Sequence, residues 1–228
     1  PSIGVASTAG SAARRCRGRA APRTPTTSTS GRWPASSCAR VSDVEYDLFV
    51  DLQGGEDRFS GEVTIRFNLS DPSADLSLDF GGGTVQRLVA NGTPIAAAYN
   101  GFFLTLPAAS LRRGANSISI SFEHPYDSDG TGLHRFVDPA DGRTYLYSYL
   151  WPYYANRLFP SFDQPNLKAA ISLSVRAPQD WTVVSTGIAS TEASVNGSTL
   201  WRFSTTPRMS TYVFSLHAGP YRIWTSDA

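Results

Sequence analysis

Apolar and polar residues alternate one by one along most of the chain after Val41, and this pattern constrains the fold more than any other feature. Successive side chains of a strand point to opposite faces, so a period of two indicates strands that bury one face. No convincing helical period of 3.6 occurs between residues 43 and 228. The alternating apolar positions are Val44, Tyr46, Leu48, Val50 and Leu52; Phe59, Val63, Ile65, Phe67 and Leu69; Leu76, Leu78 and Phe80; Ile118, Ile120 and Phe122; Ile171, Leu173 and Val175; and Tyr212, Phe214 and Leu216.

Turn signals separate these runs. Asn91-Gly92 is the strongest hairpin signal, and Gly54-Gly55, Gly81 to Gly83 and Asn196-Gly197 mark further turns. Strands that recur every 8 to 12 residues or so with turns between them are typical of a sandwich or an open, curved antiparallel sheet. We therefore predict an all-β fold with at most one short helical turn, at Tyr153 to Arg157 after Pro152.

The first 40 residues have a different composition. They are rich in Ala, Ser, Thr, Arg and Pro, and the first 42 residues hold seven arginines and no acid. We expect residues 1–40 to be a disordered tail and residues 41–228 to be one β domain. Such a tail fits an organelle transit sequence, and an upstream or mis-framed translation is the alternative. If the tail is not a targeting sequence, a cytoplasmic location is favoured. Because the chain starts with Pro, we expect a processed product or an incomplete reading frame.

Composition argues against several classes of partner. A net charge of +1 in 228 residues argues against nucleic acid. No apolar run is long enough to span a membrane. The two cysteines, Cys16 and Cys38, both lie in the tail, so we expect no disulfide framework in the folded part.

The segment from Tyr145 to Lys168 is the best place to look for function. It is rich in aromatic residues, and the steps Trp151-Pro152 and Phe159-Pro160 push the preceding residues out of helical dihedrals. Its pattern matches neither an alternating strand nor an amphipathic helix. We expect a packed connection with a defined shape.

Known catalytic and metal motifs are absent. None of His124, His134 and His217 begins an H-E-x-x-H pair, and we expect each to be a hydrogen-bonded structural residue. The acids Asp127, Asp129, Asp138 and Asp141 could hold Ca²⁺ through oxygen ligands. The alternative is a solvated turn region, because Asp favours Asx turns.

The order of several short motifs is more specific. T-G-L-H-R-F at Thr131 is followed by D-P-A-D-G, by Y-L-Y-S, and by F-P-S-F-D-Q-P-N-L-K-A from Phe159. Together with V-S-D-V-E-Y-D-L near Val41, W-T-V-V-S-T-G at Trp181 and the later T-P-R-M-S-T-Y-V-F-S-L-H-A-G-P-Y, they span residues 41–224. This set resembles the N-terminal domain of the aminopeptidase N family, the gluzincin zinc aminopeptidases.

The resemblance implies a large, saddle-like, twisted antiparallel β domain that packs against a C-terminal catalytic domain of the same polypeptide. In the family that catalytic domain carries the zinc site. The 228 residues contain no H-E-x-x-H. We therefore expect no catalytic residue, metal site or cofactor in this chain, and no peptide hydrolysis by the family mechanism from this chain alone. Zinc is implied for the catalytic domain.

The family's N-terminal domain also reaches over the active site with a Q-x-E loop, in which Glu holds the substrate α-amine and Gln lines the first pocket. By alignment, Tyr149 takes the Gln position and Trp151 the Glu position. We identify Tyr149 and Trp151 as candidate contacts for the N-terminus of a peptide substrate. A Trp ring offers an ammonium group its π face and no negative charge. Simple loop packing of both residues is the alternative.

Three functions remain open from the sequence. The first is the N-terminal β domain of a zinc aminopeptidase, which buttresses the catalytic domain and shapes the substrate pocket. The second is a non-catalytic scaffold or interaction domain of the same fold, and the third is a carbohydrate-binding β-sandwich. The first predicts an exposed apolar patch on the side that would face the catalytic domain.

Overall fold

The computed structural model describes residues 39–53, 55, 57–192 and 197–224, whose regular elements are strands and short 3-10 turns. The predicted all-β fold is confirmed. The strands are β1 Val41–Asp51, β2 Arg58–Leu69, β3 Leu76–Asp79, β4 Thr84–Ala90, β5 Thr93–Pro94, β6 Ala98–Tyr99, β7 Phe103–Leu106, β8 Gly114–Pro125, β9 Gly132–Val137, β10 Thr144–Tyr149, β11 Ala170–Pro178, β12 Thr182–Ser185, β13 Ala189–Glu192, β14 Ser198–Phe203 and β15 Leu216–Gly219. The turns are η2 Ala108–Ser110, η3 Ala155–Arg157 and η4 Thr211–Val213.

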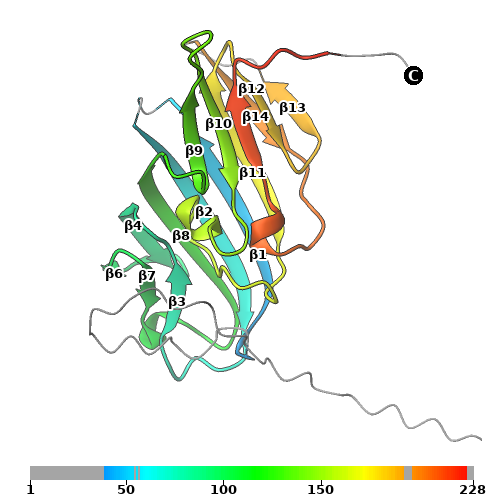
Figure 1. Ribbon diagram of the computed structural model, residues 1–228. Helices are drawn as coiled ribbons and strands as arrows, with labels where there is room; N and C mark the ends of the chain where they lie inside the picture. The colour runs from blue at the N-terminus through cyan, green and yellow to red at the C-terminus, as the bar shows by residue number, and fades with distance from the viewer. Residues whose placement is uncertain (1–38, 54, 56, 193–196, 225–228) are drawn as a thin grey trace, which may run out of the picture. The chain divides into compact units, whose positions relative to one another are not determined.

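The strands form three sheets (Figure 1). The eight-stranded sheet has the order β13-β14-β11-β1-β2-β8-β4-β5, the four-stranded sheet β12-β15-β10-β9, and the three-stranded sheet β3-β7-β6. The pairing is antiparallel except between β1 and β11, which run parallel from Glu45↔Ala170 to Asp51↔Arg176. An alternating pattern cannot specify strand direction, so this parallel pair could not be predicted from the sequence.

The eight-stranded sheet buries one face. Along its central strands every second residue is buried, as in Val63, Ile65 and Phe67 of β2. One cluster of buried apolar side chains takes members from all three sheets. The two smaller sheets therefore pack on the buried face of the large sheet, where Figure 1 shows them.

Two aromatic residues of the F-P-S-F-D-Q-P run fill the middle of this core. The Phe159 ring lies edge-on to Tyr46, with ring centroids 5.4 Å apart, and Phe162 lies edge-on to Phe67 at 5.3 Å. The backbone N–H of Phe162 donates to the Tyr46 hydroxyl at 2.9 Å. The run most characteristic of the family resemblance is therefore a packing element here.

The segment from Tyr145 to Lys168 departs from our prediction at its start. Residues 144–149 form β10, which pairs with β9 and β15. The strand was missed because its outward residues are aromatic while Thr144 and Ser148, on the side of the buried Leu146, are polar, which reverses the usual contrast between the two faces.

The predicted helical turn is present as η3, but η2 and η4 are further turns, so the limit of one turn is wrong. The strand predicted from Tyr212, Phe214 and Leu216 is also wrong at its start, because η4 covers Thr211–Val213 and β15 begins at Leu216.

Asn91-Gly92, the strongest predicted turn, lies among the described residues. Asn91 and Gly92 have φ values of 51° and 85° and join β4 to β5, so the predicted hairpin turn is confirmed. Gly54 and Asn196 lie outside the described residues, as does the predicted tail up to residue 38. Arg40, which we assigned to the tail, bonds through its guanidinium to the carbonyls of Asp71, Ala74 and Asp75.

We find no helix among the described residues with the length and apolarity needed to cross a membrane.

Candidate functional site

The four-stranded sheet carries an aromatic outer surface. Directly opposite residues on neighbouring strands share a face, and the register aligns Val184 of β12, His217 of β15, Tyr147 of β10 and His134 of β9 in one row. Phe136 and Tyr145 form the next row on the same side. We call Val184, His217, Tyr147, His134, Phe136 and Tyr145 the aromatic face.

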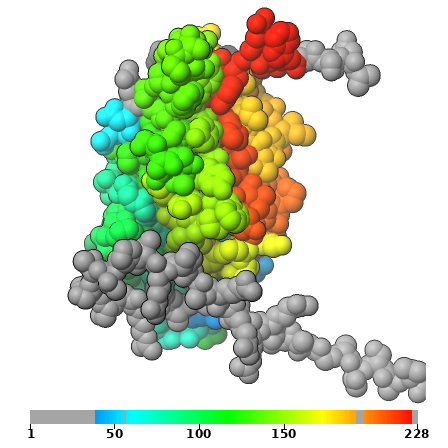
Figure 2. All heavy atoms as spheres, in the orientation of Figure 1, coloured from blue at the N-terminus to red at the C-terminus, as the bar shows by residue number. Residues whose placement is uncertain are grey.

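In the part of the chain that the structure describes, the aromatic face is exposed to solvent. Val184, Tyr147 and Phe136 are 51%, 36% and 44% exposed. The rings of His134 and Tyr147 lie 4.8 Å apart. Figure 2 looks onto this side, and there the green of β9 and β10 and the red of β15 reach the surface with no described element over them.

The two candidate substrate contacts extend the aromatic face. Tyr149 ends β10 opposite Gly132, and Trp151 follows in a turn. Their side chains are 46% and 57% exposed, whereas Leu150 between them is buried and anchors the loop. The peptide bond between Trp151 and Pro152 is cis. The structure thus brings Tyr149 and Trp151 to the surface together.

A buried carboxylate holds the far side of this loop. The Tyr153 hydroxyl donates to Asp79 Oδ1 at 2.5 Å, and the backbone N–H of Asp163 donates to Asp79 Oδ2 at 2.9 Å. Burial raises the pKa of Asp79 to about 6, although both hydrogen bonds act the other way. Burial also raises the pKa of Tyr153.

Asp163, of the F-D-Q-P motif, is a second buried carboxylate. It accepts hydrogen bonds from the Asn156 backbone N–H at 3.1 Å, the Asn156 side-chain amide at 2.9 Å and the Thr211 hydroxyl at 2.6 Å. Burial raises its pKa, again against the effect of these bonds. Asp163 therefore ties η3 to η4 below the loop. The sequence analysis assigned this role to neither Asp79 nor Asp163, although Asp163 lies between Pro160 and Pro165 in the motif run.

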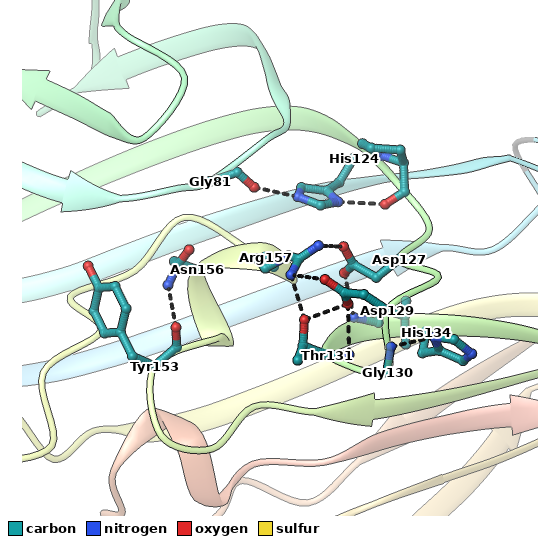
Figure 3. A network of polar contacts seen from close by, with 12 residues as sticks. Gly81, His124, Asp127, Asp129, Gly130, Thr131, His134, Tyr153, Asn156 and Arg157 are labelled. Carbon is teal, nitrogen blue, oxygen red and sulfur yellow. Dashed lines mark hydrogen bonds and ion pairs between the residues drawn. The ribbon is translucent and has the colours of Figure 1, made fainter. Parts of the chain in front are cut away.

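Arg157, the last residue of η3, is the centre of an ionic cluster (Figure 3). Its guanidinium pairs with Asp127, with Asp129 at 2.9 Å, and with the Thr131 hydroxyl at 2.5 Å. Hydrogen bonds from Thr131 and then Arg157 hold the pKa of Asp129 well below its usual range. Burial raises the pKa of Asp127, and the charge of Arg157 opposes that rise. The cluster fastens the turn before β9 to the end of the loop.

The four acids that suggested a Ca²⁺ site do not meet. Asp127 and Asp129 face Arg157, while Asp138 and Asp141 accept from the backbone N–H groups of Ala140 and Arg143, each at 2.8 Å, as Asx turns do. Asp129 also accepts from the backbone N–H of Thr131 at 3.0 Å, so the turn interpretation is the correct one for Asp129, Asp138 and Asp141. The sequence did not predict the ion pairs.

The donor set of the described residues does not fit a zinc ion. No group of three or more His, Cys, Asp or Glu side chains comes together in the part of the chain that the structure describes. His124 contacts two backbone carbonyls, and His134 accepts from the Gly130 N–H at 3.0 Å. His217 lies two strands from His134, and burial lowers its pKa. His124 and His134 thus have the structural hydrogen bonds that we predicted.

Comparisons with known proteins agree with this architecture. The family model of the peptidase M1 N-terminal domain matches residues 42–213. Aminopeptidase N of Streptomyces lividans is 35% identical over 180 residues, which cover 77% of this chain and 20% of that protein. Probable aminopeptidase 1 of Saccharolobus solfataricus is 29% identical over 173 residues, covering 75% of this chain and 21% of that protein.

Solved structures show the same fold. A mutant M1 zinc metallopeptidase from Deinococcus radiodurans superposes with a TM-score of 0.66 at 20% identity, over 79% of this chain and 42% of that chain. A two-domain M1 zinc metallopeptidase bound to L-tryptophan gives 0.66 at 21% identity, over 79% and 43%. The chain thus spans about a fifth of the length of the two curated relatives and less than half of these two structures.

Proposed function

The chain belongs to the peptidase M1 N-terminal domain family, and from that premise we propose that it works as the N-terminal β domain of a zinc aminopeptidase-like protein. In this role it buttresses a catalytic domain of the same polypeptide. Its loop at Tyr149 and Trp151 lines the pocket for the first residue of a peptide substrate. The zinc chemistry belongs to the catalytic domain, because the described residues of this chain offer no ligand set for the ion.

The aromatic face is the observation that carries this proposal. An exposed row of aromatic and aliphatic side chains on a sheet is costly in water and is typical of a surface that another domain covers. The loop with Tyr149 and Trp151 continues directly from β10, so a domain seated on this face would meet both side chains. A buttressing face and a pocket wall would then be parts of one continuous surface.

The loop chemistry favours an aromatic first pocket. Neither Tyr149 nor Trp151 can neutralise an ammonium group, and a Trp ring contributes about 0.5 to 2 kcal/mol through its π face. Asp79, the carboxylate attached to the loop, is buried and already accepts the Tyr153 hydrogen bond. The substrate amine would therefore be held less firmly by this loop than by a carboxylate, and aromatic side chains would gain from stacking.

The coding DNA around these 228 codons provides the first test. We expect an in-frame H-E-x-x-H with a downstream Glu, encoding the zinc ligands of a gluzincin catalytic domain. A reading frame without this motif on either side would refute the aminopeptidase proposal.

The second test is catalytic and uses the full-length protein. We expect zinc-dependent release of N-terminal amino acids, and Trp151→Glu should raise kcat/KM for a small aliphatic substrate about tenfold by restoring an ion pair with the amine. Trp224→Glu, at another exposed Trp outside the loop, is the matched control and should change little.

A non-catalytic scaffold of the same fold is the second candidate. The aromatic replacements at Tyr149 and Trp151 favour it, because they remove the group that holds the substrate amine in the family. A full-length protein with no zinc-dependent peptidase activity, in both the natural form and Trp151→Glu, would support the scaffold. Zinc-dependent activity of the natural form would exclude it, whereas activity of Trp151→Glu alone would leave the natural protein a scaffold.

A further inference from the structure

The hairpin between β6 and β7 carries an Asn-Gly step that the proposed function does not use. Asn100 and Gly101 follow β6 in the three-stranded sheet of Figure 1. Asn100 is exposed, and Gly101 has a φ of 89°, in the left-handed region that glycine adopts without strain. Because glycine has no Cβ, its backbone nitrogen is open to close approach by the carboxamide of the preceding asparagine.

The carboxamide of Asn100 is folded back over this turn. Its Oδ1 accepts hydrogen bonds from the backbone N–H of Phe102 at 2.9 Å and from that of Phe103 at 2.8 Å. The backbone N–H of Asn100 donates to the carbonyl of Phe103 at 3.3 Å, which closes the turn. The carboxamide therefore lies beside the residues that directly follow Asn100 in the chain.

The two N–H groups that bind Asn100 Oδ1 have the geometry of an oxyanion hole. When a nucleophile adds to an amide carbon, negative charge develops on the amide oxygen, and N–H donors at about 2.7 to 3.1 Å stabilise that charge. The N–H groups of Phe102 and Phe103 both lie within this range of Asn100 Oδ1. Since Asn100 is exposed, solvent can protonate its amide nitrogen, Nδ2, as that nitrogen leaves.

Asn91-Gly92, the other Asn-Gly turn whose two residues the structure describes, is built differently. The Asn91 side chain reaches across to other segments instead of lying over its own turn. Its Oδ1 accepts from the N–H of Ser117 at 3.1 Å, and its Nδ2 donates to the carbonyl of Ser110 and to Asn116 Oδ1, each at 3.0 Å. Asn91 must break these three hydrogen bonds before its carboxamide can meet the nitrogen of Gly92.

We propose that Asn100 is a site of self-catalysed deamidation, in which the backbone nitrogen of Gly101 attacks the carboxamide and the two N–H groups of the turn stabilise the oxyanion. The Gly101 nitrogen gives its proton to a solvent base and bonds to Asn100 Cγ. The Cγ–Nδ2 bond then breaks, and Nδ2 takes up one proton from solvent and leaves as ammonia. Water opens the resulting five-membered imide at either carbonyl, which gives an aspartyl or an isoaspartyl linkage. The reaction consumes only water and does not depend on the aminopeptidase proposal.

The modified turn would contact residues next to the substrate loop. The Gly82 N–H donates to the carbonyl of Gly101 at 3.0 Å, and the preceding Gly81 donates to the carbonyl of Asn156 in η3 at 3.0 Å. An aspartyl product adds a negative charge to the turn, and an isoaspartyl product lengthens its backbone by one carbon. We therefore expect the Gly82 N–H to exchange with solvent faster in the deamidated chain.

Peptide mapping of the aged chain tests the proposal. The folded 228-residue protein is kept in neutral buffer at physiological temperature, and mass spectrometry of its digests measures deamidation separately at Asn91 and Asn100. We expect Asn100 to react at least about tenfold faster than Asn91, because Asn91 reacts only after local opening of its hydrogen bonds. Aspartyl and isoaspartyl forms should both appear at position 100.

The same chain unfolded in denaturant is the matched control, because Asn91 and Asn100 are then both unstructured Asn-Gly steps. Their rates should be similar there, and Asn100 should react at least as fast in the folded chain, since the oxyanion hole exists only in the fold. Slower reaction of Asn100 in the folded than in the unfolded chain would overturn the proposal. So would equal rates of Asn91 and Asn100 in the folded chain, whatever the outcome for the aminopeptidase proposal.

Discussion

The outer faces of the two larger sheets differ although their inner faces are alike. The outer face of the eight-stranded sheet is polar: Thr64 bonds to Ser119 at 3.0 Å, and Arg66 lies 3.9 Å from Asp47. Phe49, an aromatic residue on that face, lies under the guanidinium of Arg176. The outer face of the four-stranded sheet is the aromatic face. Both sheets bury one side, so the difference lies in the outer faces, and the proposed function assigns the aromatic one to a partner domain.

The ion pairs on the polar outer face and beneath the loop also differ in their burial. On the polar face Arg58 and Glu123 pair with 57% and 33% of their side chains exposed, so solvent screens them. Beneath the loop, Arg157 pairs with Asp127, whose side chain is 4% exposed. We expect the buried pair of Arg157 to stabilise the fold and the exposed pair of Arg58 to contribute little to its stability.

Gly132→Ala should be the most destabilising change. Gly132 has φ +64°, and an added Cβ would lie 1.9 Å from Asp127 Oδ2 and 3.0 Å from Arg157 Cβ. Backbone strain and displacement of a buried ion pair together should cost about 4 kcal/mol in urea unfolding. Gly142→Ala is the control, since Gly142 has φ +69° and no atom near its Cβ position, and strain alone costs about 1 kcal/mol. Equal losses for both variants would refute the clash.

Arg157→Met should cost about 3 kcal/mol, because it leaves the buried carboxylate of Asp127 without its cation. Arg58→Met, which breaks the exposed pair with Glu123, should cost less than about 1 kcal/mol. Chemical denaturation of the two variants at the same pH and salt measures the difference. Equal destabilisation by Arg58→Met and Arg157→Met would show that the buried ion pair contributes no more to stability than the exposed one.

Asp79 should make the domain less stable at neutral pH than in mild acid. Burial raises the pKa of Asp79 to about 6, above its ordinary value of 3.8. The folded state then binds the proton more tightly, so its contribution to stability is complete below about pH 4 and is lost as the pH rises through 6. Asp163, whose pKa is also raised, acts in the same direction.

Between about pH 4.5 and 7.5 the wild-type domain should lose on the order of 2 kcal/mol of unfolding free energy that Asp79→Asn does not lose. The Tyr153 hydroxyl can accept from the new amide as readily as it donates to the carboxylate. Asp47→Asn, on the polar outer face, should leave the wild-type slope in place. An unchanged slope in Asp79→Asn would show that this carboxyl group is not the source.

Tyr147→Thr should have the smallest effect on stability, below about 1 kcal/mol, because Tyr147 is on an open surface. Its effect should instead appear in surface hydrophobicity, as weaker fluorescence of a dye that binds apolar surfaces. Thr64→Ser on the polar face is the control. A wild-type chain that is monodisperse and binds no dye would contradict the aromatic face as an open docking surface.

Much of the fold could be predicted from the sequence, because alternation is a local property. The buried positions of β1, β2 and β11, such as Leu48, Ile65 and Leu173, follow directly from the period of two. The hairpin turn at Asn91-Gly92 could also be predicted, because it needs only two residues with positive φ. The strand β10 was missed, because its outer face is made of Tyr145, Tyr147 and Tyr149 while its inner face includes polar residues, which reverses the contrast on which the pattern depends.

The candidate site could be predicted only in part. Tyr149 and Trp151 were named through the order of motifs, and the structure brings both to the surface; their contact with a substrate stays a prediction. The contacts that hold them could not be anticipated. Asp79 meets Tyr153 across 74 residues, and Thr211 meets Asp163 across 48. No spacing in the sequence encodes such pairs.

The sequence by itself determined which side chains form the core, where the chain turns and the family to which the domain belongs. These depend on hydrophobic periodicity, backbone geometry and an ordered set of short motifs. Only the tertiary structure decided that β1 runs parallel to β11, that the acids near residue 127 face Arg157 rather than a metal, and that His124 contacts the carbonyl of Gly81. Each of these depends on segments far apart in the chain, whose contacts form only when the sheets pack.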